Sequence, residues 1–135
     1  MKMTNEGLLS LAKEAIENAY CPYSRFGVGA ALLCGDGEVF TGCNIENASF
    51  SLTLCAERTA FAKALSSGKR DFKAIAIVGG KDKRAEKFCY PCGACRQVMS
   101  EFCSEDFELI FEDENGRTDT ATLGQLLPKS FDFGE

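Results

Sequence analysis

Apolar residues along the chain alternate between helical and strand spacing. Residues 5–19 place their apolar side chains three and four positions apart, which is typical of one face of an amphipathic helix. Residues 27–34 are a continuous small and apolar run, and a Gly-Asp-Gly turn joins them to a second run at 39–43, as in a β-hairpin. This part of the chain is expected to form a helix followed by two antiparallel strands, with Cys34 facing Val39.

The rest of the chain continues the alternation after a connection over residues 44–53. Four elements are expected in the order helix, strand, helix and strand, at 54–66, 74–78, 92–103 and 108–111. Gly79-Gly80 is expected to end the buried strand, and Pro91 to open the second helix of this set. Residues 120–127 are expected to form a short helix or irregular chain. This order predicts an α/β protein with a mixed sheet covered by helices, and a length of 135 residues suits one domain over 1–135.

Charge and hydropathy argue against nucleic acid and membrane as partners. Fifteen basic and twenty acidic residues give a formal net charge of −5, and the basic residues are scattered, so no basic surface for nucleic acid is expected. No apolar stretch approaches the roughly 18 residues that a membrane span needs. The first residues lack the apolar core of a secretory signal, so the expected location is the reducing cytoplasm.

Histidine is absent from the sequence, and there are eight cysteines. Acid–base chemistry must then use carboxylates, and a transition-metal site must use thiolates. Cys92 and Cys95 stand three positions apart at the opening of a helix, which places both sulfurs on one face, where the helix N-terminus favours thiolates. By itself this pair is compatible with zinc binding, with a redox couple and with coincidence.

A third cysteine favours zinc. Cys55 opens the helix at 54–66, and Glu57 follows it in a largely apolar stretch where a carboxylate without a role is costly. Three protein ligands leave the fourth tetrahedral position of zinc open, which is the catalytic pattern, and a carboxylate beside such a site can act as general acid and base. Because three thiolates outweigh the charge of zinc, a nearby cation or several N–H donors to sulfur are needed. Arg58 is the first candidate for this role and Arg96 a lesser one.

Other interpretations of the cysteines remain open at this point. Five of them are each expected to pack in the core: Cys21, Cys34, Cys43, Cys89 and Cys103. A disulfide framework fits poorly, since Cys43 would lie about 13 Å along the strand from the position opposite Cys34. Cys89 could act as a fourth ligand and close the site. A structural zinc module and a thiol redox protein are therefore the alternatives from other functional classes.

Four ordered segments resemble the small zinc cytidine deaminases, the homotetrameric class with three cysteine ligands. The segment Cys55-Ala56-Glu57 followed by Pro91-Cys92-Gly93-Ala94-Cys95 resembles the zinc signature of these enzymes. Residues 21–31 are similar to their N-terminal signature, and residues 42–48 to their ribose-binding segment. Leu126-Leu127-Pro128, followed by Phe131, is similar to their C-terminal ending.

The resemblance implies a three-layer α/β/α fold with a central mixed sheet of about five strands. It implies a homotetramer with one zinc ion per subunit, bound by Cys55, Cys92 and Cys95. The implied reaction is hydrolytic deamination of cytidine and 2'-deoxycytidine to uridine and 2'-deoxyuridine, with release of ammonia, in pyrimidine salvage. Zinc would activate water, and Glu57 would carry its proton to N3 of the base and later a proton to the leaving amine. A deaminase of a related nucleoside such as blasticidin S is the nearest alternative.

The resemblance also implies a set of substrate contacts. Asn44 and Glu46 would bind the ribose hydroxyls, Phe26 would stack on the pyrimidine, and the backbone at Ala56 would bind the base edge. Three residues would contribute to the pocket of a neighbouring subunit: Ala48, Phe50 and Phe131. Many relatives carry tyrosine at the position of Phe50. Without the resemblance, Asn44 and Glu46 would be interpreted as part of a surface turn, and Phe26 and Phe131 as core residues.

Overall fold

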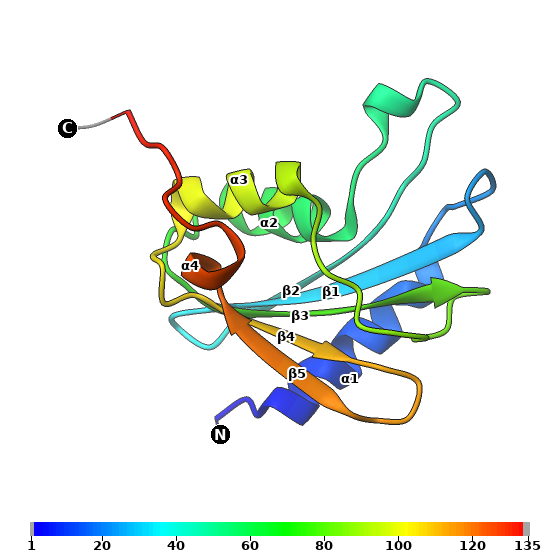
Figure 1. Cartoon of the computed structure of the whole chain (residues 1–135), viewed down its shortest axis with the longest axis horizontal. Coiled ribbons are helices and arrows are strands. Elements are labelled where there is room, and N and C mark those ends of the chain that lie inside the picture. The colour runs from blue at the N-terminus through cyan, green and yellow to red at the C-terminus, as the bar shows by residue number, and fades with distance from the viewer. Residues whose placement is uncertain (1, 134–135) are drawn as a thin grey trace.

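Five strands form one mixed sheet with helices on both of its faces (Figure 1). The structure, a computed structural model, describes residues 2–133. The strands are β1 (Phe26–Cys34), β2 (Val39–Cys43), β3 (Phe72–Lys81), β4 (Glu108–Glu112) and β5 (Thr118–Thr122). Their order across the sheet is β2-β1-β3-β4-β5, and β3 and β4 form the parallel pair. The predicted α/β fold with a five-stranded mixed sheet between helical layers is confirmed.

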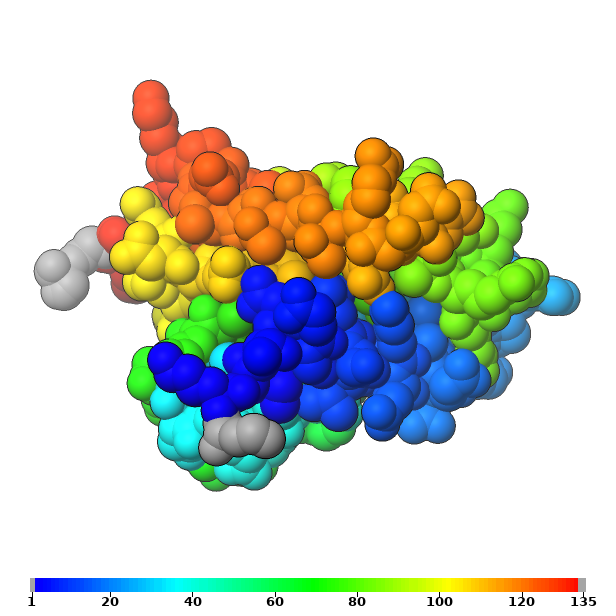
Figure 2. Space-filling view, turned by 90° about the horizontal axis from the view of Figure 1, so that it is seen from below, coloured from blue at the N-terminus to red at the C-terminus, as the bar shows by residue number. Residues whose placement is uncertain are grey.

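Helices cover the two faces of the sheet unequally. Helix α1 (Asn5–Ala15) lies on one face, where Figure 2 shows it in blue beside the orange β5 segment. Helices α2 (Ala56–Ser66) and α3 (Gly93–Phe102) lie together on the other face. No helix in the described part of the chain has the length and apolar character that a bilayer crossing needs.

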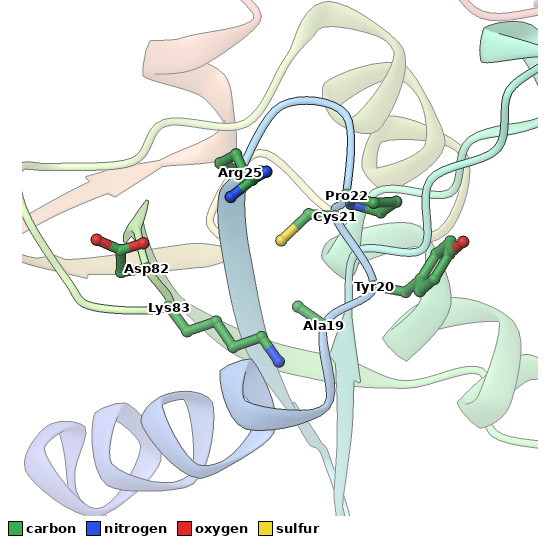
Figure 3. Close-up of a pocket in the computed structure, with 7 residues that line it drawn as sticks. All are labelled: Ala19, Tyr20, Cys21, Pro22, Arg25, Asp82 and Lys83. Atoms are coloured by element: carbon green, nitrogen blue, oxygen red, sulfur yellow. The ribbon is translucent and has the colours of Figure 1, made fainter.

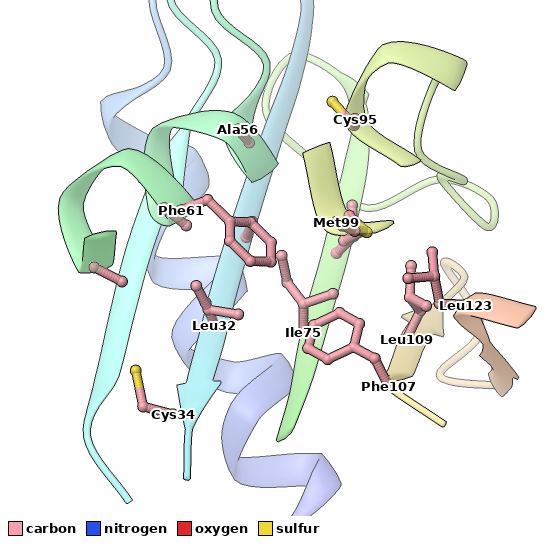
Figure 4. Packing of buried hydrophobic residues seen from close by; sticks show 14 of the residues in the cluster. Leu32, Cys34, Ala56, Phe61, Ile75, Cys95, Met99, Phe107, Leu109 and Leu123 are labelled. Atoms are coloured by element: carbon pink, nitrogen blue, oxygen red, sulfur yellow. The ribbon is translucent and has the colours of Figure 1, made fainter. Parts of the chain in front are cut away.

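Alternation along the strands divides the apolar side chains between two cores. Between the sheet and α2 and α3, the larger core contains Leu32, Phe61, Ile75, Met99, Leu109 and Phe111 (Figure 4). Under α1, the smaller core contains Leu8, Leu9, Ala12, Ile16, Ala31, Val78 and Ile110. Complete burial of one such large side chain contributes about 1.5–3 kcal/mol to folding. Both faces of the central strands are thus covered, which explains their continuous apolar runs.

The first helix ends earlier than its apolar spacing predicts. It stops at Ala15, and residues 16–18 form a single 3₁₀ turn. The backbone of Tyr20 then pairs like a strand: its N–H donates to the carbonyl of Asn44, and its carbonyl accepts from the N–H of Glu46. A residue committed to these bonds cannot continue a helix, so tertiary pairing overrides the local pattern. Helices α2 and α3 begin within two residues of their predicted starts, and the connection at 44–53 contains a 3₁₀ turn at Phe50–Leu52.

The expectation that Gly79-Gly80 ends the third strand is wrong. Both glycines lie inside β3 and pair with Val28 and Gly27 of β1. A Cβ atom at Gly80 would lie 1.9 Å from the carbonyl oxygen of Arg84, so the returning loop passes directly over the strand. Here glycine marks a close approach of backbone rather than a strand end.

Two local expectations near turns are also corrected. Leu33, not Cys34, faces Val39, because the hairpin has a three-residue turn in which Gly37 adopts a φ of 95°. Residues 118–122 form β5, followed by the short helix α4 (Leu123–Leu126), where a short helix or irregular chain was expected over 120–127. The sequence of β5 is polar because the strand lies at the sheet edge, so it has no apolar run to reveal it.

Helix α2 rests directly on strand β2 at Gly42. A Cβ atom there would lie 2.4 Å from the carbonyl oxygen of Ala56 and 2.6 Å from the backbone nitrogen of Ala60. Real side-chain atoms do not approach backbone so closely, so the helix would have to move outward. Gly42 therefore sets the height of the first turn of α2 above the sheet.

We expect Gly42→Ala to lower the free energy of unfolding by about 1–3 kcal/mol, because the added methyl group overpacks this contact. Gly93→Ala is the matched control, since a Cβ at Gly93 meets nothing within 4 Å. Urea denaturation of both purified variants measures the difference. Equal stabilities would contradict the role of Gly42 in seating α2.

Candidate active site

Three cysteine sulfurs meet where α2 and α3 begin. Cys55 is the N-cap residue of α2, Cys92 is the N-cap residue of α3, and Cys95 lies one turn into α3. All three sulfur atoms lie within 4.8 Å of one another. The Sγ atoms of Cys55 and Cys92 are 3.9 Å apart, and those of Cys92 and Cys95 are 3.6 Å apart.

These distances suit a tetrahedral zinc ion. Zinc–sulfur bonds of about 2.3 Å at tetrahedral angles place two sulfurs about 3.8 Å apart, between the two separations observed. Within residues 2–133, no other group of three cysteine or carboxylate side chains is close enough to share an ion. Both separations therefore fit zinc, and the third pair of sulfurs, those of Cys55 and Cys95, lies within 4.8 Å.

Cys89 does not belong to the cluster, so the alternative in which it acts as a fourth ligand is not supported. Its sulfur packs over Gly79, against which the ring of Phe26 also lies. Burial raises the pKa of the Cys89 thiol to about 12, and the negative charge of nearby Glu57 contributes. Cys89 is thus a neutral thiol in the wall beside the site.

The surroundings of the cluster favour a thiolate at Cys55. Two helix N-termini point at it, and Nη2 of Arg58 donates a hydrogen bond to Sγ of Cys55 at 3.4 Å. Hydrogen bonding from the Cys95 thiol, followed by that from Arg58, lowers the pKa of Cys55. The same sharing of a proton with Cys55, together with burial, raises the pKa of Cys95. The nearby cation expected from charge balance is therefore present in the form of Arg58.

Arg96, the lesser candidate for this role, makes different contacts. Its Nε donates to the carbonyl of Pro91 at 2.9 Å, and its Nη1 donates to the carbonyl of Leu126 at 2.7 Å. Both guanidinium bonds thus go to backbone oxygens rather than to sulfur. Arg96 links the start of α3 to the end of α4 and does not neutralise the cluster by a hydrogen bond.

Glu57 lies in the first turn of α2 and is buried, with 5% of its surface exposed. Burial raises the pKa of its carboxyl group to about 7, and the charge of Cys55 acts in the same direction, while Arg58 opposes it. This burial excludes the simplest interpretation of Glu57, in which it is a solvated glutamate on a helix surface. A carboxyl group that exchanges its proton near neutral pH is suited to general acid–base chemistry.

Asn44 and Glu46 are buried, so their interpretation as a surface turn is wrong. The Asn44 side chain accepts from the N–H of Val28 and donates to the carbonyl of Phe26, both at 2.9 Å. The Glu46 carboxylate accepts from the N–H groups of Tyr23 and Ser24 and from the Ser24 hydroxyl. These hydrogen bonds lower the pKa of Glu46 even though burial alone would raise it. Asn44 therefore fixes the start of β1, and Glu46 fixes the loop that precedes it.

Sequence reasoning did not find Tyr23 and Ser24, which lie more than 20 positions from Glu46. Their only sequence signal was the resemblance of the 21–31 segment, which carried no role for either residue. Phe26, expected in the core on its residue type alone, is half-buried at the start of β1, and Ala56 is fully buried at the start of α2.

The described chain does not bring Ala48, Phe50 and Phe131 into a buried site. Ala48 and Phe50 lie exposed on the projecting segment at 44–55, which Figure 1 shows in turquoise and green above the sheet. Phe131 is 69% exposed, so its interpretation as a core residue is wrong. Its neighbours along the chain pass over the outside of α3 rather than into the core.

The other cysteines and the cavities add little to this centre. All eight cysteines are free, which contradicts a disulfide framework. Cys34 is buried in the larger core, and Cys89 and Cys103 pack against it, as expected. Cys21 and Cys43 differ from this expectation, since both are only partly buried and belong to neither core. Cys21 lines a cavity of about 530 Å³ (Figure 3). No residue of the candidate site lines that cavity, so it carries no argument about the chemistry.

The fold and the site together define a zinc-binding α/β protein with a buried carboxyl group beside its metal. Residues 2–110 match the family model described as the cytidine and deoxycytidylate deaminase zinc-binding region. The chain belongs to this family. Its cofactor is zinc, and the single three-cysteine cluster of the described residues accounts for one ion per chain.

Individual relatives agree with the family assignment. A cytidine deaminase from Sporosarcina psychrophila is 48% identical over 129 residues, covering 96% of this chain and 92% of the relative. A crystal structure of cytidine deaminase from Burkholderia pseudomallei superposes with a TM-score of 0.88 at 48% identity, covering 96% of this chain and 100% of that one. A blasticidin-S deaminase from Bacillus cereus is more distant, with 31% identity over 128 residues, 92% of this chain and 89% of the relative.

We expect the purified protein to contain one zinc ion per chain and Cys92→Ala to weaken zinc binding by at least about a hundredfold, because one of three sulfur ligands is lost. Cys89→Ala is the matched control and should retain the metal. Metal analysis by mass spectrometry after dialysis against a weak chelator measures both. Zinc loss from the Cys89 variant alone would contradict the assignment of the cluster.

Proposed function

We propose that this chain catalyses the zinc-dependent hydrolysis of cytidine and 2'-deoxycytidine to uridine and 2'-deoxyuridine, with release of ammonia. The observation that carries the proposal is the meeting of three cysteine sulfurs beside the buried Glu57. Relatives named cytidine deaminase, similar over almost the full chain, support the choice of substrate. The catalytic unit would be a single domain over residues 1–135, acting in pyrimidine salvage in the cytoplasm, where eight free thiols are expected to stay reduced.

Cys55, Cys92 and Cys95 would hold the zinc ion. When bound, zinc supplies Lewis acidity that lowers the pKa of water toward neutrality. The hydrogen bond from Arg58 to Cys55 would withdraw negative charge from the sulfurs, so that three thiolates do not cancel this effect. Arg58 therefore acts through the ligands and does not touch the substrate.

Glu57 would move the protons of the reaction. A carboxyl group with a pKa near neutral can accept a proton from water and deliver it to N3 of the cytosine ring. It can then take the second proton of the same water, whose oxygen is now bonded to C4, and deliver it to the exocyclic amine. The C4–N bond then breaks, the oxygen remains as the carbonyl of uracil, and the amine leaves as ammonia. Burial keeps competing water away from this carboxyl group and maintains its affinity for protons.

The substrate would lie between the loop before β1 and the start of α2. Phe26 would stack on the pyrimidine, and the backbone at Ala56, in the first turn of α2 where N–H groups lack helical acceptors, would bind the base edge. Asn44 and Glu46 would bind the ribose hydroxyls through side-chain donors and acceptors that are not already engaged in hydrogen bonds to the protein. An amide nitrogen has two hydrogens, and only one of those of Asn44 is committed to Phe26.

A homotetramer would complete the site. The projecting segment at 44–55 exposes four large apolar side chains, Ile45, Phe50, Leu52 and Leu54, which a soluble monomer would leave in water. In an assembly, Ala48 and Phe50 of this segment, and Phe131 of the C-terminal segment, would reach the pocket of a neighbouring subunit. Phe50 would contribute an aromatic ring that lacks the hydroxyl group of the tyrosine found there in many relatives.

Substitution of Glu57 tests the proposed reaction. We expect Glu57→Gln to keep its zinc and its stability while kcat falls by at least about 10²–10⁴-fold, because an amide cannot carry the proton. Glu14→Gln, on the exposed face of α1, is the matched control. Ammonia release is measured with cytidine, 2'-deoxycytidine, cytosine, CMP and blasticidin S. Near-normal turnover by the Glu57 variant would falsify the role of Glu57, and a preference for blasticidin S would favour the alternative substrate.

A charge on the projecting segment tests the assembly. We expect Leu52→Glu to lower the mass in solution from that of four chains and to abolish most activity, because a carboxylate cannot be buried in an apolar interface without a partner. Zinc content should be unchanged. Ser10→Glu, on the exposed face of α1, should stay tetrameric. Sedimentation equilibrium measures both, and an intact, active tetramer of the Leu52 variant would rule out this interface.

A further inference from the structure

The segment that leads into Cys92 is held by side chains rather than by backbone. Residues 87–91 form no helix or strand, and none of their backbone groups bonds to another backbone group in the described chain. Its earlier end is anchored, since the N–H of Glu86 donates to the carbonyl of Gly79. Between this anchor and Cys92, the side chain of Tyr90 makes both a hydrogen bond and a ring contact to the sheet.

The Tyr90 side chain contacts both residues of one pair between β4 and β5, at the edge of the sheet. Its ring meets the ring of Phe111 edge-on, with centroids 4.7 Å apart and planes at 72°. Its hydroxyl donates a hydrogen bond to Oδ2 of Asp119 at 2.8 Å. Phe111 and Asp119 are direct partners in the β4–β5 ladder, so their side chains lie on the same face. The apolar part of Tyr90 thus rests on a buried ring and its polar end on a carboxylate.

This anchor lies two residues before the most exposed member of the metal cluster. Cys92 caps α3 without any side-chain hydrogen bond at the cap. Arg96 of α3 fixes the chain on both sides of the Cys92 nitrogen, because its Nε donates to the carbonyl of Pro91 and its backbone N–H donates to the carbonyl of Cys92. One residue further back, the Tyr90 side chain is the next fixed point, and it ties this segment to the sheet. Its release would leave Cys92 held through α3 alone.

We propose that Tyr90 and Asp119 form a positioning pair that holds the Cys92 sulfur at the spacing required for zinc. The proposal rests on the zinc site of the proposed function, but not on its substrate. A hydrogen bond to a carboxylate is stronger than one between neutral groups, and partners that orient a metal ligand affect metal retention. Loss of the pair would widen the distribution of Cys92 positions and speed zinc release, with the substrate contacts left in place.

Zinc transfer from the purified zinc-loaded protein to a chelating dye measures this directly. We expect Tyr90→Phe, which keeps the ring on Phe111, and Asp119→Ala each to release zinc about three- to tenfold faster. The double variant should be no faster than the faster single variant, because both changes remove the same bond. Asp119→Asn should release zinc at a rate between those of the parent protein and Asp119→Ala, since its neutral amide oxygen still accepts from the hydroxyl but more weakly.

Asp36→Ala is the matched control. It removes a surface carboxylate that pairs with Lys69 at 2.7 Å on the distant β1–β2 turn, and it should leave zinc release unchanged. Release from Tyr90→Phe at the rate of this control would overturn the proposal. A double variant whose effect equals the product of the two single effects would also overturn it. Because the assay uses no substrate, these outcomes are separate from a failure of the Glu57 test.

Discussion

Three sulfur atoms can share one ion in this chain only because two helices begin at the same place. Cys55 and Cys92 stand just outside the first turns of α2 and α3, and Cys95 lies one turn further, so the positions of both helices set the sulfur spacing. Gly42 lets α2 rest directly on β2, and the apolar core under both helices holds them against the sheet. The metal site is thus a consequence of how the helical layer packs.

The same arrangement governs the electrostatics. Crowding three thiols together is unfavourable for their ionised forms, and the helix N-termini with Arg58 offset this cost. Glu57 experiences the opposite balance, since burial and the neighbouring sulfur charge favour its protonated form. The start of α2 therefore supplies a ligand that ionises easily and a carboxyl group that exchanges its proton near neutral pH. That division of roles is what a hydrolytic deamination requires.

Sequence reasoning succeeded where the signal is local and failed where partners are distant. Buried runs predicted β1 and β3, and the spacing of Cys55, Cys92 and Cys95 with Glu57 predicted the centre. The polar edge strand β5 was missed because only its pairing with β4 makes it a strand. The burial of Asn44 and Glu46 depends on bonds to residues at least 16 positions away, which no local pattern reveals. Residue type alone would place Phe131 in the core, although it is exposed in the single chain.

The open fourth position of the metal is the central claim, and X-ray absorption spectroscopy at the zinc edge tests it most directly. For the purified protein, the account predicts three sulfur neighbours at about 2.3 Å and one lighter oxygen or nitrogen neighbour at about 2.0 Å. A shell of four sulfurs, with no lighter neighbour, would show that the site is closed by the protein and would contradict the account.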